Sequence, residues 1–363
     1  MNNLTALVVD DTIVYRKIVG DILKEIPGVA VVGTANNGKI ALSKIKSLKP
    51  DLVTLDIEMP EMTGIEVLQQ LHDLDHPPKV IMVSTLTRHG SEMTIKALEL
   101  GAFDFIAKPD EGTMAQNLAK VKAALAPIII AVKHQKITPR TIREKTAPKA
   151  RPARHPHSLP AAVPPAKHRI KTKSEIVGIG ISTGGPNALT KMVPMLPADF
   201  KAPILIVQHM PPMFTASLAN SLNNKSRLIV KEAQDGDILT AGTVYIAPGG
   251  RQMKIVAGAD GVSRKIHITD DPPENSCKPS VDYLFRSIAR YYVGRATGVI
   301  MTGMGSDGTK GLVQLKENGG MVIAQDAASC TVFGMPKQPI ETGLVDVIAP
   351  LEKIADEIVK TVI

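Results

Sequence analysis

The hydrophobic and polar positions of this 363-residue chain form two series of alternating elements. In the first series, short apolar runs rich in β-branched residues alternate with stretches whose apolar residues recur at helical spacing. The predicted strands are Leu4–Val9, Ala30–Gly33, Leu52–Leu55, Val80–Val83 and Phe103–Ile106. The predicted helices are Val14–Ile26, Lys39–Leu48, Gly64–Leu71 and Ser91–Leu100. This alternation predicts a doubly wound α/β domain with a parallel sheet over residues 1–125.

A second α/β series occupies residues 174–363. Its predicted strands are Ile176–Ile181, Ile204–Val207, Leu228–Lys231, Val244–Ile246, Met253–Val256, Lys265–Ile268, Gly298–Met301 and Met321–Ala324. Its predicted helices are Asn187–Met195, Pro212–Leu222, Val281–Tyr291, Gly308–Glu317 and Leu351–Val362. The middle strands follow one another without helices between them. We therefore expect a second doubly wound, mostly parallel-sheet domain that contains a hairpin portion.

Residues 126–173 have a different composition, which predicts a linker. Between Lys133 and Lys173 there are seven prolines, 12 Lys or Arg and one acid, Glu144. This segment carries a charge of +11, so the remaining chain carries 8 − 11 = −3 of the net +8. Such a composition cannot bury a core and is typical of an extended tether. The alternative is a basic arm for nucleic acid, but no aromatic residues are interleaved to stack bases, and we expect no nucleic-acid partner.

The remaining composition favours a cytoplasmic protein without membrane insertion. The N-terminus lacks the basic and apolar regions of a secretory signal. The apolar run Ala123–Val132 is too short to cross a bilayer and contains Pro127. The two cysteines, Cys277 and Cys330, provide neither a disulfide framework nor metal-ligand spacing.

Acidic residues gather at the predicted strand ends of the first domain. Asp10 and Asp11 end the first strand and Asp56 ends the third, while Ser84 ends the fourth and Lys108 follows the fifth. In a parallel sheet these ends meet at one edge. Three carboxylates there could hold Mg²⁺, and a carboxylate can also accept a phosphoryl group. Any one of them alone could be a solvated loop residue, but five suitable residues at five matching positions argue for a site.

These positions resemble the response-regulator receiver domain, which has a flavodoxin-like fold. The resemblance is carried by Val9–Asp11, Leu55–Pro60, Gly64, Ser84 and Ala107–Pro109. It implies that Asp56 is the phosphoacceptor and that Asp10, Asp11 and Asp56 bind Mg²⁺ together with the carbonyl of Glu58. It also implies that Ser84 and Phe105 form a switch pair and that Lys108 contacts the phosphoryl group.

In the second domain, Gly180–Gly184 follows a predicted strand and has the pattern G-x-S-x-G. Such a turn either exposes a nucleophilic serine, here Ser182, or holds a phosphate. A serine nucleophile needs a histidine base. Only His209 and His267 lie after residue 173, and we favour His209, because it follows a strand while His267 lies within an alternating run. Asp307, in a glycine-rich turn, is the candidate orienting acid or, alternatively, only the cap of the following helix.

The second domain resembles the catalytic domain of CheB-type protein-glutamate methylesterases. The matching motifs are Gly180–Gly185, Gln208–Pro212, Tyr245–Pro248, Thr302–Gly308 and Ala328–Pro336, although Ile181 and Ser306 depart from the usual Ala and Asn. The resemblance implies that Ser182 is the nucleophile, His209 the base and Asp307 the orienting acid. It also implies Met304 as a backbone donor to the oxyanion and Thr183 in a supporting role.

This resemblance further implies a function and its partners. The expected substrates are γ-glutamyl methyl esters on chemoreceptors, with deamidation of certain glutamines, and the expected phosphodonor is a chemotaxis histidine kinase. We expect the unphosphorylated receiver to pack over the esterase cleft. Two other functions remain open: a DNA-binding response regulator that uses the basic segment, and a binding module with an inactive esterase domain. Methanol release from methylated receptor distinguishes these possibilities.

Overall fold

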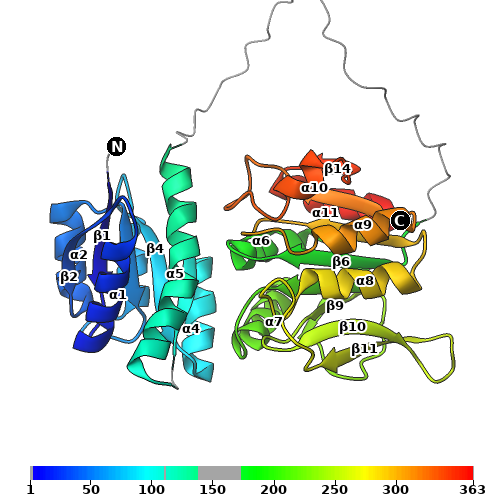
Figure 1. Ribbon diagram of the computed structural model, residues 1–363, viewed down its shortest axis with the longest axis horizontal. Coiled ribbons are helices and arrows are strands. Elements are labelled where there is room, and N and C mark those ends of the chain that lie inside the picture. The colour runs from blue at the N-terminus through cyan, green and yellow to red at the C-terminus, as the bar shows by residue number, and fades with distance from the viewer. Residues whose placement is uncertain (1–2, 110–111, 138–172, 363) are drawn as a thin grey trace, which may run out of the picture.

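The computed structural model describes residues 3–109, 112–137 and 173–362, so most of the predicted basic linker lies outside the described residues. Two α/β domains lie side by side, the first blue to green and the second green to red in Figure 1. Each domain has its own parallel sheet with helices on both faces. The predicted fold class is confirmed.

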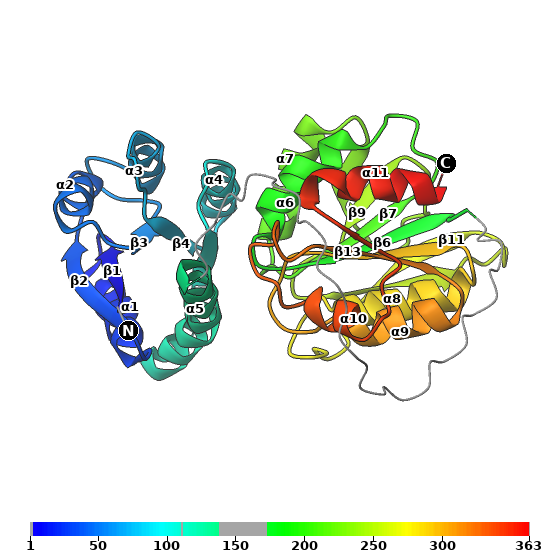
Figure 2. The same ribbon diagram turned by 90° about the horizontal axis from the view of Figure 1, so that it is seen from above.

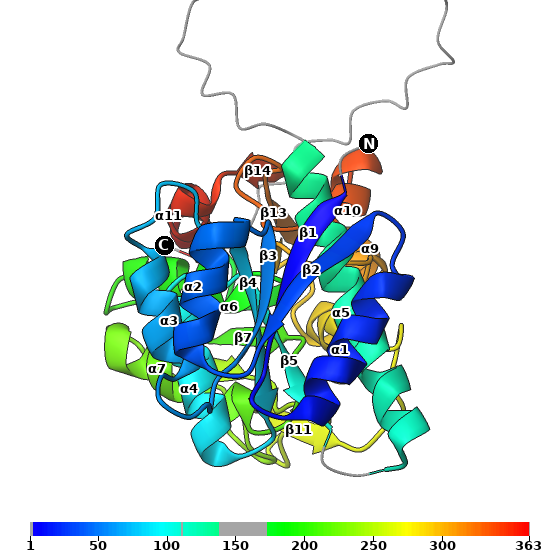
Figure 3. The same cartoon turned by 90° about the vertical axis from the view of Figure 1, so that its left-hand side faces the viewer.

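The first domain has a five-stranded sheet in the order β2-β1-β3-β4-β5. The strands are β1 (Leu4–Val9), β2 (Val29–Ala35), β3 (Leu52–Asp56), β4 (Lys79–Thr85) and β5 (Asp104–Lys108). The helices are α1 (Ile13–Glu25), α2 (Gly38–Leu48), α3 (Gly64–Leu71), α4 (Arg88–Glu99) and α5 (Met114–Ile137). α1 and α5 cover one face of the sheet, while α2, α3 and α4 cover the other (Figure 3). Apolar side chains alternate between these two faces, which gives the sheet a core on each side.

Helix α5 runs beyond the boundary predicted at residue 125. It continues through Pro127 to Ile137, so the first twelve residues that we assigned to the linker, 126–137, are helical. Ile128, Ile129 and Val132 are buried against the receiver sheet, and this burial holds the helix past the proline. Among the described residues, the stretch Met114–Lys133 of this helix is the one long and apolar enough to cross a membrane by length and composition.

The second domain has a seven-stranded sheet in the order β14-β13-β12-β6-β7-β9-β8, with parallel neighbours throughout. Its strands are β6 (Ile176–Ile181), β7 (Ile204–Gln208), β8 (Ile229–Glu232), β9 (Thr243–Ile246), β12 (Ala296–Ile300), β13 (Met321–Gln325) and β14 (Val347–Ala349). The predicted hairpin is β10 (Gln252–Ala257) paired antiparallel with β11 (Arg264–Thr269).

Helices enclose this second sheet on both faces (Figure 2). They are α6 (Gly185–Met192), the short η1 (Val193–Met195), α7 (Phe214–Lys225), α8 (Val281–Tyr291), α9 (Thr309–Glu317), α10 (Lys337–Glu341) and α11 (Leu351–Val362). β6 lies between β7 and β12, so the chain winds outward from β6 in two directions. In open α/β sheets, ligands bind beyond the strand ends at such a switch point.

The two domains contact each other through α4 and β5 of the first and α6 and α7 of the second. Phe105 stacks on Phe214, with ring centroids 4.6 Å apart. The hydroxyls of Ser91 and Ser217 lie 2.7 Å apart and are buried. Three polar contacts surround this centre: Lys225 with Glu99 at 2.6 Å, Ser221 with Glu99, and the Asn187 amide with the Ala102 carbonyl at 3.1 Å. The face of the receiver that carries Phe105 is therefore covered by the second domain.

Candidate active site and phosphorylation site

The turn that carries Ser182 is fixed to the strands on both sides of β6. The Ser182 amide donates to the Thr302 carbonyl at 2.9 Å, just beyond β12. The Ser182 carbonyl accepts from the Gln208 side chain at 3.0 Å and from the Gly185 amide at 2.7 Å. Parallel pairing of Ile181 with Gln208 places Ser182 level with the residue that follows β7. These contacts hold the half-buried serine at the switch point of the sheet.

Gln208 explains why Gly185, the second glycine after Ser182, is needed. A Cβ at Gly185 would lie 1.9 Å from the Gln208 side-chain oxygen, so only glycine fits without displacing this side chain. Gln208 is buried and bridges the carbonyls of Ser182 and His209 with its amide. Gln208 was not among the predicted site residues. Its signal was an uncharged polar residue at the end of a buried strand, directly before the candidate base.

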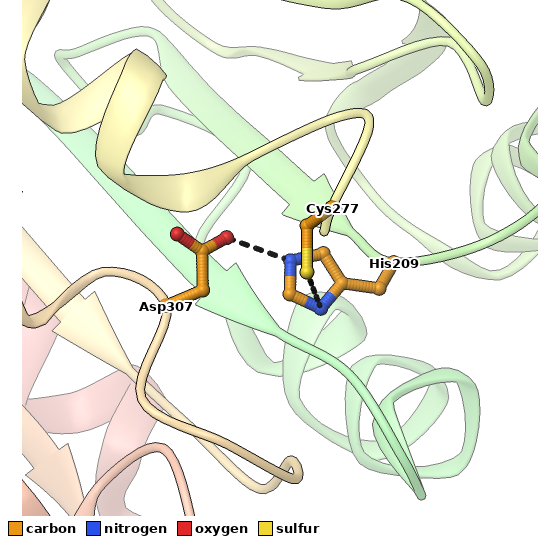
Figure 4. Close-up of side chains that lie close together, drawn as sticks. All are labelled: His209, Cys277 and Asp307. Carbon is orange, nitrogen blue, oxygen red and sulfur yellow. Dashed lines mark hydrogen bonds and ion pairs between the residues drawn. The ribbon is translucent and has the colours of Figure 1, made fainter. Parts of the chain in front are cut away.

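His209 and Asp307 form the predicted pair, with Nε2 of the imidazole 2.9 Å from Oδ2 of the carboxylate (Figure 4). The His209 side chain is 15% exposed and that of Asp307 is 3% exposed. His209 follows β7, and Asp307 lies on the loop between β12 and α9. The second histidine, His267, pairs instead with Asp235 at 2.7 Å on the half-exposed hairpin. The preference for His209 as the partner of the orienting acid therefore agrees with this geometry.

Asp307 is held as a carboxylate by six hydrogen bonds. Besides His209, the donors are the Asn275 amide, the Ser280 hydroxyl and the backbone amides of Val281, Asp282 and Gly308. Burial alone would raise the pKa of Asp307, but the bond and charge of His209 and these donors lower it to about 2. Asp307 therefore caps the N-terminus of α8, a helix distant in sequence, while α9 begins after Gly308 without a side-chain cap. The alternative of a cap for the following helix is thus wrong.

The imidazole of His209 has a raised pKa. Burial lowers the pKa of His209, but hydrogen bonds to Asp307 and Cys277 outweigh it and raise the pKa to about 9. Because Nε2 faces Asp307, Nδ1 is the nitrogen available as a base. In this structure Nδ1 lies 3.8 Å from the Cys277 thiol (Figure 4). Among the described residues, no hydrogen bond joins the Ser182 hydroxyl to His209.

Met304 and Thr183 lie in loops next to the serine, and their roles remain predictions. The Met304 loop approaches closely, because a Cβ at Gly303 would stand 2.7 Å from that of Ser182. In the described part of the chain, the Met304 amide makes no hydrogen bond, which leaves it able to donate to an oxyanion. The Thr183 carbonyl accepts from the Thr302 hydroxyl at 3.0 Å. Both arrangements fit the expected oxyanion and supporting roles.

In the receiver, Asp56 lies at the end of β3 beside Asp10 and Lys108. Nζ of Lys108 is 2.7 Å from Asp56 Oδ2 and 2.9 Å from Asp10 Oδ2. Burial raises the pKa of Asp56 to about 7, and the Asp10 charge adds to this against the lowering effect of Lys108. Thr12 binds the other oxygen of Asp10 through its amide at 2.9 Å and its hydroxyl at 2.5 Å. One lysine cannot neutralise two buried carboxylates, so the cluster keeps an excess of negative charge.

This cluster fits a divalent cation by its donor set. Oxygen atoms of Asp10, Asp11 and Asp56 lie within 4.8 Å of one another. Asp10 Oδ2 is buried and, despite its closeness to Lys108, accepts no well-directed hydrogen bond. Buried carboxylate oxygens with remaining lone pairs are the ligands that Mg²⁺ prefers. Glu58 is exposed beyond β3, and the contribution of its carbonyl remains a prediction.

The predicted switch residues Ser84 and Phe105 contact other groups in this structure. The Ser84 hydroxyl donates to the Gly90 carbonyl at 3.1 Å, at the start of α4. Phe105 is buried against Phe214 of the second domain. Of the predicted set, the structure therefore groups Asp10, Asp11, Asp56 and Lys108 into one site, and places Phe105 in the domain interface.

Comparisons with known proteins agree with the two-domain organisation. The sequence profile of the CheB methylesterase family matches residues 177–358, and that of the response regulator receiver domain matches residues 6–119. The chain is 58% identical to a protein-glutamate methylesterase/protein-glutamine glutaminase of Desulfotalea psychrophila, over 100% of this chain and 99% of that protein. It is 43% identical to the Bacillus subtilis protein of the same name, over 99% and 98%. The crystal structure of the Thermotoga maritima CheB methylesterase catalytic domain is 44% identical, with a TM-score of 0.51, over 53% of this chain and 100% of that one.

Proposed function

Because this chain belongs to the protein-glutamate methylesterase/protein-glutamine glutaminase family, we propose that it hydrolyses γ-glutamyl methyl esters, and deamidates glutamines, on chemoreceptors. The observation that carries this proposal is the 2.9 Å pair of His209 and Asp307 at the sheet edge where Ser182 follows β6. A serine next to an imidazole that is oriented by a buried carboxylate is the constellation of acyl transfer.

We propose a task for each of these side chains. Nδ1 of His209 takes the Ser182 proton while Oγ bonds to the ester carbonyl carbon, and the imidazolium then returns this proton to the departing methoxide. Water, deprotonated by the same nitrogen, then attacks the acyl carbon; its bond to Oγ breaks, the imidazolium returns the proton to Oγ of Ser182, and a glutamate is left. Asp307 keeps its charge and holds Nε2 throughout, because its six donors stabilise the carboxylate. With a glutamine, the same steps release ammonia instead of methanol.

Phosphorylation of Asp56 is the proposed control. Mg²⁺, held by Asp10, Asp11, Asp56 and the Glu58 carbonyl, would supply the charge that phosphoryl transfer needs, and Lys108 would bind the phosphoryl oxygens. The phosphodonor would be a chemotaxis histidine kinase. The chain carries out this work in the cytoplasm, where both the kinase and the modified receptor segments would be reached.

The docked receiver would restrain the esterase in the unphosphorylated protein. Asp104 of β5 is buried at the interface, and burial raises its pKa to about 7, although hydrogen bonds from the Phe105 amide and the Thr183 side chain oppose this. The receiver thus reaches the residue next to Ser182. A preference of about 1.4 kcal/mol for this docked form would suppress activity tenfold.

Methanol release from methylated receptor tests the proposed function. The native chain is expected to release methanol and form glutamate, whereas Ser182→Ala should show only the background rate while keeping the same folded stability. The absence of release from the native chain, with or without a phosphodonor, would contradict the proposal. If Ser182→Ala released methanol at the native rate, the assignment of the nucleophile would be wrong.

A further inference from the structure

Cys277 contacts the second ring nitrogen of the His209 imidazole, Nδ1. Its sulfur lies 3.8 Å from Nδ1 of His209, whereas Asp307 contacts the other ring nitrogen, Nε2 (Figure 4). Cys277 comes from the loop between β11 and α8, so three separate loops meet at one imidazole. The nitrogen that the reaction needs as a base is therefore in contact with a thiol in the resting structure.

The loop that carries Cys277 is firmly held. Arg286 of α8 binds Glu274 with two bonds of 2.5 and 2.6 Å, and the backbones of Glu274 and Cys277 exchange two hydrogen bonds. The Asn275 amide donates to Asp282 at 2.8 Å and to Asp307 at 3.0 Å. Asn275 and Ser276 lie between the two bonded backbones and adopt φ angles of 50° and 62°, the positive values that both central residues of a two-residue type I′ hairpin turn require. This tight turn and its side-chain contacts fix the position of Cys277.

The contact has a chemical consequence for the base. A sulfur in contact with Nδ1 occupies the position that the serine hydroxyl must take next to this nitrogen. Cys277 also helps to raise the pKa of His209, which favours the protonated ring that cannot accept the proton of Ser182. Both effects withhold the base from the nucleophile.

We infer that Cys277 is a positioning residue of the esterase, whose thiol holds the Nδ1 face of His209 and restrains its use as a base until the sulfur moves aside. This inference rests on the proposed function. It does not make Cys277 a nucleophile toward the ester. It predicts that removing the thiol makes His209 a base at lower pH.

Other charged groups also surround the pair. They are Asp307 on the β12–α9 loop, Asp282 at the start of α8, and Glu274, which is neutralised by Arg286. Asp307 and Cys277 both favour the imidazolium, and burial opposes it. Only Cys277 can be removed while the Asp307–His209 bond is kept.

The test compares pH profiles of methanol release for the full-length native chain, Cys277→Ala and Cys277→Ser. With Cys277→Ala, the acid limb of kcat/KM should move about one pH unit lower, a roughly tenfold gain near pH 7. Cys277→Ser should shift it less, because a hydroxyl can still hydrogen-bond to Nδ1. Cys330→Ala is the matched control and should keep the native limb. An unmoved limb in Cys277→Ala, with or without a uniform loss of rate, would overturn the inference.

A second readout does not require esterase activity. Iodoacetamide should alkylate Cys277 of the native chain faster than Cys330, whose pKa burial and Asp326 raise to about 12. His209→Gln should slow alkylation of Cys277 several-fold and leave Cys330 unchanged. Equal Cys277 rates in the native and His209→Gln chains would overturn the thiol–imidazole contact. Absent methanol release combined with the expected alkylation would contradict the proposed function alone.

Discussion

Asp56 and Asp307 are both buried aspartates next to a basic group, yet their environments shift their acidity in opposite directions. Asp56 lies 2.7 Å from Lys108, and its pKa is raised to about 7. Asp307 lies 2.9 Å from His209, and its pKa is lowered to about 2. The basic partner therefore does not decide the outcome. What differs is the number of donors on each carboxylate and the charge of its other neighbours.

Asp307 receives six hydrogen bonds, several of them from the start of α8, where the helix dipole also favours an anion. Asp56 receives the Ile57 amide and the Lys108 ammonium and shares the latter with the carboxylate of Asp10. A carboxylate stabilised as an anion orients a base without reacting. A carboxylate short of positive charge attracts a cation and can be modified. The surroundings of each carboxylate thus decide whether it only orients a base, as Asp307 does, or can bind a cation and be modified, as Asp56 can.

The largest expected effect comes from removing the negative charge of Asp307. Asp307→Asn should lower kcat for methanol release by about 10⁴-fold, because the amide cannot stabilise the imidazolium and favours the wrong tautomer. The control is Asp235→Asn, which breaks the other aspartate–histidine pair, with His267, and should keep the native rate. A loss of less than tenfold in Asp307→Asn would show that its charge is not needed.

Removal of divalent cations should affect phosphorylation of Asp56 but not ester hydrolysis. With a chelator present, incorporation of phosphate from a small-molecule phosphodonor should fall at least tenfold, because the carboxylates around Asp56 then repel the donor. Basal methanol release should stay unchanged, since Ser182, His209 and Asp307 use no metal in the proposed reaction. Equal phosphorylation with and without the chelator would show that the carboxylate cluster is not a metal site.

The charge of Asp307 should also affect how kcat/KM depends on pH, because it helps to raise the pKa of His209. Since the pKa of His209 is raised to about 9, the imidazole is mostly protonated at neutral pH and only its neutral form accepts the serine proton. Native kcat/KM should therefore rise close to tenfold per unit between about pH 6 and 8 and level off above about 9. A profile already flat above about pH 7 would contradict the raised pKa.

A smaller effect is expected from removing one of the six donors. Asn275→Ala deletes the amide that bridges Asp307 and Asp282 and should lower kcat by about three- to tenfold, the loss of one hydrogen bond to a charged group. Asn223→Ala, which removes an Asn side-chain bond to the Val230 amide away from the site, is the control for general destabilisation. If both variants kept native kcat, the donors around Asp307 would be redundant.

The strand ends, and with them most site residues, could be predicted from the sequence, because apolar runs fix the strands and parallel topology brings their ends together. Asp307 and His209 meet as expected for this reason. Contacts between distant loops have no local signal, so the capping of α8 by Asp307 and the approach of Cys277 were not predictable. The linker boundary was set too early because Pro127 and the basic composition beyond it suggested an end that burial of Ile128 and Ile129 overrides.

The domain interface could not be predicted from the sequence either, since nothing in the local residue pattern shows that Phe105 stacks on Phe214. A phenylalanine at the end of an apolar run is expected to be buried in its own domain. Here the second domain completes its burial. The contact therefore links the receiver to the segment that follows His209, since α7 begins at Phe214.

The most direct test of the division between a reactive and a fixed aspartate is methanol release measured before and after addition of acetyl phosphate with Mg²⁺. For the native chain we predict a rise of about tenfold or more. Asp56→Asn should show the unphosphorylated rate and no rise, and Asp307→Asn should stay near background in both conditions. A rise in Asp56→Asn equal to that of the native chain would contradict the account.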